Sequence, residues 1–351
     1  MIPISAIVDY KNRFGSKWKD EPYRSGFDQR LLSKAFAERG FSLTFTPFSE
    51  VFASGTNWKD RLVLYTSSEE IGRNYKPFIE DIVEGLAVAG AHLLPAEPFL
   101  RAHDDKVFME ILRDQLLGEE LSGIKSRGFG TLEEFQSALD GGQLTFPCVL
   151  KGAFGAMSRN VALARNAAEA LREVKRLSRT PHYRFEWRDY LRSKRWPGYL
   201  RESLYQQRLV VQPFIPGLDG DWKVLVYGDQ YYVLKRHIRP GDFRASGSHM
   251  DYRAGLESGI TPEILSFVEK IYQRLDVPHL SADIAFDGKR SYLIEFQTVY
   301  FGTSTQAEFC KEYFIRRGES WTHEPNTMSQ EEVFAWGLSH YLKRHPELLG
   351  K

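Results

Sequence analysis

Two carboxylates and one amide lie within a pair of apolar segments in the last quarter of the sequence. The segments flank a turn at Asp287-Gly288 and contain Asp283, Glu295 and Gln297. Glu295 and Gln297 share one strand face because side chains alternate with a period of two. A loop of three or five residues would place Asp283 directly opposite Glu295, and an even number would send them to opposite faces. Such oxygen ligands suit Mg²⁺ shared with nucleotide phosphates better than zinc, although a half-exposed strand face with incidental polar residues has the same pattern.

A lysine followed by a loop of small residues lies near the middle of the chain. The sequence at 145–164 is TFPCVLKGAFGAMSRNVALA, in which an apolar strand ends at Lys151 and a second strand follows the loop. Small residues let a loop backbone approach an anion closely, and a lysine adds a point charge. The small residues are Gly152, Gly155 and Ser158. The pattern fits a phosphate-binding loop, but glycine loops are common, and on its own it is more often an ordinary hairpin with a surface lysine.

A second group of cations follows a predicted hairpin. Residues 210–249 read VVQPFIPGLDGDWKVLVYGDQYYVLKRHIRPGDFRASGSH, with a turn signal at Gly228-Asp229. The return strand carries Arg236, and Arg244 lies in the loop after it. Arginine is suited to bidentate contacts with phosphate and carboxylate. We therefore favour an anion site over a solvated basic loop.

Lys106 lies in the first turn of a helix predicted at 104–117. A cation at that position opposes the helix dipole, so this lysine is a further candidate for anion binding. A solvated surface lysine is the alternative.

The N-terminal third alternates between strand and helix patterns. Apolar periodicity predicts strands and helices in the order β-α-β-β-α-β, at 3–8, 27–36, 41–48, 61–66, 78–86 and 92–95. This order predicts a small, mostly parallel sheet covered by helices. No G-x-G-x-x-G follows the first strand and no G-x-x-x-x-G-K-[ST] occurs, which argues against a Rossmann dehydrogenase and a P-loop NTPase.

Composition indicates an ordered globular protein of two or three domains. The 351 residues are 42% hydrophobic and 26% charged, with a net charge of +1. This balance argues against bulk attraction to nucleic acid or membrane. The two cysteines, Cys148 and Cys310, exclude a disulfide scaffold and suit a reducing compartment. No stretch is apolar and long enough to span a bilayer, and we expect no targeting segment.

Residues 171–208 combine basic and aromatic side chains. The segment carries eleven Lys/Arg, four Asp/Glu and seven Phe, Trp or Tyr, and its net charge of +7 leaves −6 for the rest of the chain. A solvated helical insertion is one interpretation. We favour a docking surface for an anionic substrate or a partner subunit, because Arg, Trp and Tyr are typical interface anchors.

Taken together, these segments resemble the ATP-grasp superfamily, and within it the ribosomal-protein-S6 glutamate ligase-like carboxylate–amine ligases. The resemblance runs from about residue 100 to about residue 340 and lies in the order of DDK, FPCVLKG…SRNV, VVQPFIPG, DWKVLV…LKRH…GDFRASGS and ADIAF…YLIEFQ. It implies an α/β fold in which a small parallel-sheet pre-ATP-grasp domain precedes two α+β subdomains that clamp ATP. The expected boundaries are 1–100, 101–212 for the small lid subdomain and 213–351 for the catalytic subdomain.

The resemblance also implies roles for individual residues. Lys106 and Lys151 would contact the nucleotide, and the loop with Gly152, Gly155 and Ser158 would fold over its phosphates. The adenine hinge would consist of Gln212, Pro213, Phe214 and Ile215. Arg236 and Arg244 would be the catalytic cations, and Asp283, Glu295 and Gln297 would hold Mg²⁺, with Mn²⁺ as an alternative.

Three of these positions depart from the family pattern. The hinge often has an acidic residue where Pro213 stands, the third metal ligand is usually Asn rather than Gln297, and Ser246 follows Arg244 where Asn is common. Gln297 keeps an amide oxygen, so metal ligation is expected to survive.

The implied activity is ATP-dependent ligation of a small-molecule carboxylate to an amine through an acylphosphate, in the cytoplasm. A phosphotransferase on the same fold and a non-catalytic nucleotide-binding module are the alternatives. We expect neither a membrane nor a nucleic-acid partner, and a homo-oligomer stays open.

Overall fold

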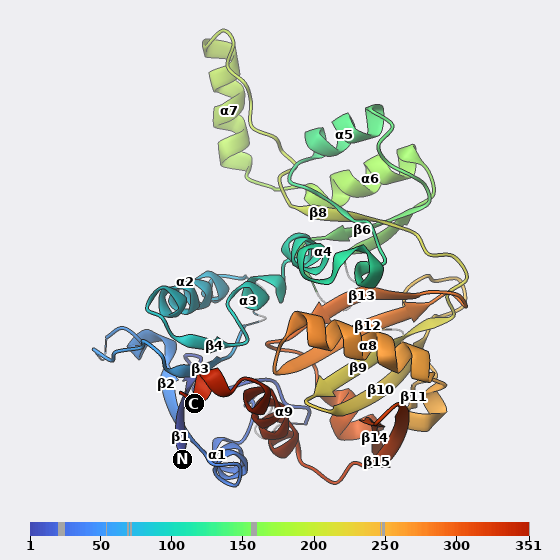
Figure 1. The fold of residues 1–351 in the computed structure, drawn as a ribbon. Coiled ribbons are helices and arrows are strands. Elements are labelled where there is room, and N and C mark those ends of the chain that lie inside the picture. The colour runs from blue at the N-terminus through green and yellow to red at the C-terminus, as the bar shows by residue number, and fades with distance from the viewer. Residues whose placement is uncertain are drawn as a thin grey trace. The chain divides into compact units, whose positions relative to one another are not determined.

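The computed structural model describes residues 1–19, 25–53, 55–68, 70, 72–155, 160–245, 247 and 250–350. The chain forms two compact units (Figure 1). Unit 1 consists of Met1–His103, Leu112–Gly123 and Leu218–Lys351, and unit 2 of Asp104–Ile111 and Ile124–Gly217. The boundaries at residues 100 and 212 that the sequence suggested stay a prediction.

Unit 1 begins with the parallel sheet that the sequence predicted. Its strand order is β2-β1-β3-β4, and all neighbouring strands are parallel. The strands are β1 (Ile2–Val8), β2 (Phe41–Pro47), β3 (Leu62–Tyr65) and β4 (His92–Leu94). Helices α1 (Gln29–Ala37), α2 (Tyr75–Val88) and α3 (Pro98–Ala102) connect or follow them. The Asp28 side chain caps α1 by accepting from the backbone N–H groups of Arg30 and Leu31.

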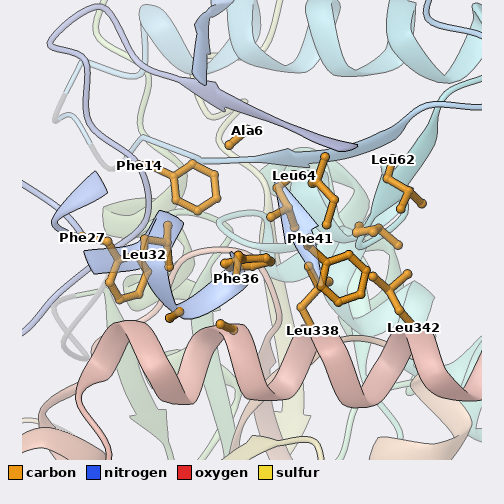
Figure 2. Packing of buried hydrophobic residues seen from close by; sticks show 14 of the residues in the cluster. Ala6, Phe14, Phe27, Leu32, Phe36, Phe41, Leu62, Leu64, Leu338 and Leu342 are labelled. Carbon is orange, nitrogen blue, oxygen red and sulfur yellow. The ribbon is translucent and has the colours of Figure 1, made fainter. Parts of the chain in front are cut away.

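Alternation along the strands divides the core of this region into two layers. Ile4, Ala6 and Val8 of β1 pack with α1 on one side, whereas Ile7 packs with α2 on the other. The C-terminal helix α9 (Gln330–Arg344) joins the first layer through Leu338 and Leu342 (Figure 2). The two ends of the chain therefore share one hydrophobic core.

The second sheet of unit 1 is antiparallel and carries most of the candidate site. Its strand order is β13-β12-β9-β10-β14-β15, and β11 pairs with β10. The strands are β9 (Gly220–Tyr227), β10 (Gln230–His237), β11 (Arg253–Ala254), β12 (His279–Phe286), β13 (Ser291–Gln297), β14 (Glu312–Arg317) and β15 (Ser320–Pro325). Helix α8 (Pro262–Leu275) precedes β12, and short helical turns lie at Phe48–Glu50, Gly255–Ser258, Thr305–Phe309 and Pro346–Leu349.

Unit 2 is an antiparallel sheet of order β5-β8-β6-β7 with two helices packed on it. The strands are β5 (Arg127–Phe129), β6 (Cys148–Gly152), β7 (Val161–Ala164) and β8 (Leu209–Pro213). The packed helices are α5 (Leu132–Asp140) and α6 (Ala167–Ser178), and a further helix, α7 (Tyr183–Arg195), extends away from them (Figure 1). Helix α4 (Lys106–Ser122) begins in unit 2, continues into unit 1 and is interrupted at Gly118, whose φ is 70°.

Within the ranges given above, no helix combines the length and the apolar character needed to cross a membrane.

Candidate active site

Strands β13, β12, β9 and β10 lie side by side in the antiparallel sheet of unit 1 (Figure 1). Six polar residues of these strands share one face of the sheet. Glu295 pairs with Asp283, which pairs with Lys223, so the three stand in one row. Arg236 pairs with Asp221, two residues before Lys223 on β9. Directly opposite residues, and residues two apart on a strand, point to the same side of a sheet. We call this set the polar face; its members are Asp221, Lys223, Arg236, Asp283, Glu295 and Gln297.

The apolar neighbours of the polar face fix its orientation. Leu225 and Tyr232 lie on the same face as Lys223 and are fully buried in a cluster with Phe301 and Val333. Burial of this cluster specifies the register of β9 and β10, because a slip of one residue would turn every side chain to the other face. The apolar half of the sheet face thereby positions its polar half.

Arg236 links two carboxylates of the polar face. It is buried, and its Nε and Nη2 donate to the two oxygens of Asp221 at 2.7 and 2.8 Å. Nη2 also lies 2.8 Å from Oδ2 of Asp283, whose Oδ1 is 3.9 Å from Nζ of Lys223. A bidentate guanidinium–carboxylate pair fixes both partners in orientation. Arg236 therefore holds Asp283 in place from one side.

Burial and neighbouring charges shift the pKa values of Asp221 and Arg236 in opposite directions. Burial raises the pKa of the Asp221 carboxyl, and the Arg236 guanidinium opposes that rise. Burial lowers the pKa of Arg236, but the carboxylates of Asp283 and Asp221 outweigh it and raise the pKa overall. Arg236 therefore stays charged.

Arg244 is held by a neighbour in its own loop. Its Nε and Nη2 donate to Oδ1 and Oδ2 of Asp242 at 3.0 and 2.9 Å. The hydrogen bonds from Arg244 lower the pKa of Asp242 to about 2, and the same contact raises the pKa of Arg244. Ser246 lies outside the described residues.

In unit 2 the structure brings Lys106 to the glycine loop. Its backbone N–H donates to the carbonyl of Ala153 at 2.9 Å, and Nζ donates to the carbonyl of Gly155 at 2.8 Å. Asp105 caps the helix by accepting from the Val107 backbone and forms a 2.6 Å ion pair with Arg208. The start of α4 and the loop after β6 thus form one local structure.

Lys151 and Gly152 end strand β6 at this loop. Lys151 is buried and pairs with Val161 on β7 and Val210 on β8. Gly152 donates its backbone N–H to the carbonyl of Asn160 at 2.9 Å. Gly155 has a φ of 120°, a conformation that L side chains rarely adopt. Ser158 lies outside the described residues.

The predicted hinge begins in the last two residues of strand β8 and continues beyond it. The Gln212 side chain is buried and donates to Glu110 at 2.8 Å, so its amide is used within unit 2. Pro213 pairs with Cys148, and the Phe214 backbone N–H donates to the carbonyl of Pro147 at 3.2 Å. Ile215 follows in the chain as a half-buried residue.

Four partners of the candidate residues were not themselves among the sequence candidates: Asp221, Lys223, Glu110 and Asp242. Asp221 and Lys223 alternate with apolar residues along β9, which is the same signal that singled out Asp283 and Glu295. Glu110 gave no such signal, because its role depends on a partner that is distant in sequence.

The donor set of the polar face fits a magnesium ion. Mg²⁺ is commonly held by one or two carboxylates together with substrate phosphates, and Asp283, Glu295 and Gln297 offer two carboxylates and an amide oxygen on one face. The described ranges contain no metal-binding group of three or more His, Cys, Asp or Glu. The proposed ligands include only two such residues, Asp283 and Glu295, and phosphate oxygens would complete the shell.

Comparison with known proteins gives a clear result for the fold. No family model matches the sequence, and no curated protein matches it either. Among solved structures, D-cycloserine synthetase DcsG is similar, with 13% identity, a TM-score of 0.53, and coverage of 97% of this chain and 99% of that one.

Two further structures have the same coverage of 97% and 99%. They are a RimK domain ATP-grasp protein from Sphaerobacter thermophilus, with 14% identity and a TM-score of 0.51, and the VanG D-Ala:D-Ser ligase from Enterococcus faecalis, with 13% identity and a TM-score of 0.50. Similarity at this level of identity concerns the fold, and it extends over nearly the whole chain. The α/β fold of this chain is the ATP-grasp fold.

Proposed function

We propose that this protein is an ATP-dependent carboxylate–amine ligase. A carboxylate oxygen of the first substrate attacks the γ-phosphorus of ATP, and ADP leaves. The amine nitrogen of the second substrate then attacks the acyl carbon, loses a proton and displaces inorganic phosphate, which leaves an amide. The observation that carries the proposal is the polar face, because carboxylates and cations on one rigid sheet suit phosphoryl transfer, a reaction driven by positioning and charge.

The residues that we propose to bind the nucleotide belong to unit 2. Lys106 and Gly155 are in contact, so a cation and a small-residue loop are held together. Lys151 ends the strand that leads into the loop. In the proposal these lysines bind the polyphosphate, and the backbone of Gln212, Pro213, Phe214 and Ile215 binds the adenine.

The proposed metal-binding residues belong to unit 1. Asp283, Glu295 and Gln297 would hold Mg²⁺, or Mn²⁺ in its place. When bound, the metal would neutralise phosphate charge and reduce its repulsion of the incoming carboxylate. Asp283 is fixed for this task by Arg236, which in turn is fixed by Asp221.

The two arginines have different tasks in the proposal. Arg236 is buried between carboxylates and keeps its charge, so it positions Asp283 and stabilises the transferred phosphoryl group. Arg244 lies in a loop with its guanidinium paired to Asp242, and it would stabilise the charge on the acylphosphate and the tetrahedral intermediate. No side-chain nucleophile is required. Small-molecule substrates in the cytoplasm complete the proposal.

A pooled screen tests this function directly. The protein is incubated with ATP, Mg²⁺ and mixtures of amino acids, peptides and sugar acids, with and without amines, and ADP release is followed by mass spectrometry of the products. The proposal expects ADP release that depends on a carboxylate and an amide product that depends on an amine. A stable phosphorylated product that ignores the amine would identify a phosphotransferase, and nucleotide binding without ADP release from any pool would identify a binding module.

A further inference from the structure

The basic and aromatic segment forms a hairpin-like projection of unit 2. Helix α7 (Tyr183–Arg195) extends away from α5, α6 and the sheet, and the chain returns alongside it to β8 (Figure 1). A bridge between Arg179 and Tyr205 closes its base. We call residues 179–205 the projection.

The inner side of α7 is polar and fully paired. Asp189 is only 1% exposed, accepts from the Tyr199 hydroxyl at 2.7 Å and lies 3.3 Å from Nε of Arg201. Glu186 forms a 2.9 Å ion pair with Arg179. Both acids of the helix are therefore paired with residues of the flanking segments, and these contacts hold α7 in place.

Exposed aromatic side chains lie on a neighbouring face of α7. Tyr183, Trp187 and Tyr190 recur at helical spacing and share one face, with Tyr183 77% and Trp187 63% exposed. Beyond the helix, Trp196 is 56% and Leu200 is 88% exposed. An ordinary amphipathic helix buries such residues against its own protein. In this projection they serve no core of the unit.

A basic stripe runs beside the aromatic one. Its members recur every three or four residues: Arg184, Arg188, Arg192 and Arg195. Lys194 adds a fifth cation. The only acids of α7 are already neutralised by Arg179 and Arg201, so the outer surface of the projection carries five positive charges with no carboxylate of α7 to balance them.

We propose that the projection docks this protein onto an anionic lipid bilayer. Clusters of four to eight Lys/Arg on an amphipathic helix are typical of binding to anionic headgroups. Trp and Tyr prefer the headgroup level, and a helix of this type lies in the interface with its rings toward the acyl chains. The chain outside residues 171–208 carries a net charge of −6, so the excess of positive charge lies in this part of the chain.

The ring geometry favours lipid over nucleic acid. Single-stranded nucleic acid needs open aromatic faces on which bases stack. Here Trp187 stacks on Tyr190, while Lys194 and Arg201 lie over the Tyr190 ring and Arg195 lies over Trp196. Because these ring faces already have partners, the rings suit the headgroup level of a bilayer better than the stacking of bases. The expectation of no membrane partner rested on the net charge of +1 and on the lack of a spanning segment, and neither bears on docking through one locally basic segment.

Vesicle binding tests the proposal without nucleotide, so its outcome is independent of the proposed ligase activity. The full chain is mixed with phosphatidylcholine–phosphatidylserine vesicles or with pure phosphatidylcholine vesicles and sedimented at low and high salt. We expect binding to the anionic vesicles that weakens with salt. Brominated acyl chains should quench tryptophan fluorescence of the bound protein, because Trp187 and Trp196 reach the interface.

Two variants test separately the contributions of the basic side chains and of the aromatic and apolar side chains to vesicle binding. Replacing Arg188, Arg192, Lys194 and Arg195 by Ser should weaken binding at least about tenfold, and Trp187→Ser with Trp196→Ser and Leu200→Ser should weaken binding and remove the quenching. The control is a second fourfold Ser variant at exposed lysines of unit 1: Lys59, Lys289, Lys311 and Lys343. Circular dichroism confirms that each variant is folded.

Several results would overturn the proposal. One is equal binding by the charge variant and the parent. Another is equal binding to both kinds of vesicle. A third is tight binding of a single-stranded oligonucleotide or of polyglutamate by a protein that ignores the anionic vesicles.

Discussion

Asp283 on β12 lies directly opposite Glu295 on β13 because Ile294 is an extra residue in the ladder. The strands are joined by the four residues 287–290, and Phe286, Ala285 and Ile284 pair in regular order with Ser291, Tyr292 and Leu293. The register then shifts, so that Asp283 pairs with Glu295 instead of Ile294. Such a β-bulge re-aims side chains and is common beside active sites. The bulge brings both carboxylates to the polar face.

We predict that Glu295→Gln abolishes metal-dependent activity while the fold persists. The substitution keeps the shape of the side chain but removes one charge from the proposed metal site, so turnover should fall by orders of magnitude. Calorimetry with a non-hydrolysable ATP analogue should also lose its dependence on Mg²⁺. Glu319→Gln, at an exposed turn of the same sheet, is the control. Unchanged turnover in the Glu295 variant would refute the metal assignment.

This pairing shows what the sequence could and could not predict about the site. Period-two alternation placed Glu295 and Gln297 on one face, and the turn at Asp287-Gly288 was correct. The register argument required an odd number of loop residues, whereas the loop has four. The pairing is nevertheless present, because the bulge supplies the missing shift. Nothing in the local residue pattern distinguishes Ile294 from an ordinary strand residue.

Lys151→Ala should weaken nucleotide binding about tenfold to a hundredfold, because a hydrogen bond to a charged group contributes roughly 1.5–3 kcal/mol. Titration with a non-hydrolysable ATP analogue measures the change. Lys175→Ala, at an exposed position of α6 in the same unit, should bind like the parent. Equal affinity of the Lys151 variant and the parent would leave this lysine a structural residue of β6.

Arg244→Ala should impair the chemical step more than ATP binding. Asp242 orients the guanidinium, and the charge is needed where negative charge develops, so we expect kcat to fall about a hundredfold with little change in KM for ATP. Arg253→Ala removes a nearby arginine that is also paired with an aspartate and serves as the control. A loss of ATP affinity with normal turnover at saturation would contradict the assigned role.

Stability should fall as the pH decreases, through His279. Burial lowers the pKa of this histidine from 6.5 to about 4, and its Nε2 donates to the carbonyl of Phe334 at 2.8 Å. In the unfolded chain His279 is therefore protonated below about pH 6.5, whereas in the folded chain it is protonated only below about pH 4. The stability that neutral His279 contributes is present above pH 6.5 and is lost as the pH falls from 6.5 to about 4, by up to roughly 3 kcal/mol.

Urea unfolding of the parent and of His279→Gln across the same pH range checks this prediction. Glutamine keeps a donor for the Phe334 carbonyl but does not titrate, so the variant should show a flatter decline in unfolding free energy. Parallel pH profiles for the two proteins would show that His279 does not contribute.

Local patterns predicted the elements well, and long-range partners were the part they missed. The parallel sheet followed from apolar periodicity, because burial on both faces leaves a clear signal in β1 and β3. The sequence did not indicate that α9 completes the core of that sheet, since this depends on contacts between the two ends of the chain. The network of Asp221, Arg236 and Asp283 likewise joins three strands.

Isotope transfer is the most direct test of the proposed reaction. Once the screen has identified a carboxylate substrate, that substrate is labelled with ¹⁸O in its carboxyl group and turned over with ATP, Mg²⁺ and the amine. An acylphosphate intermediate requires that one carboxylate oxygen leave with the phosphoryl group. The account predicts that each inorganic phosphate released carries one ¹⁸O and that ADP is the nucleotide product. Release of unlabelled phosphate, or of AMP, would contradict it.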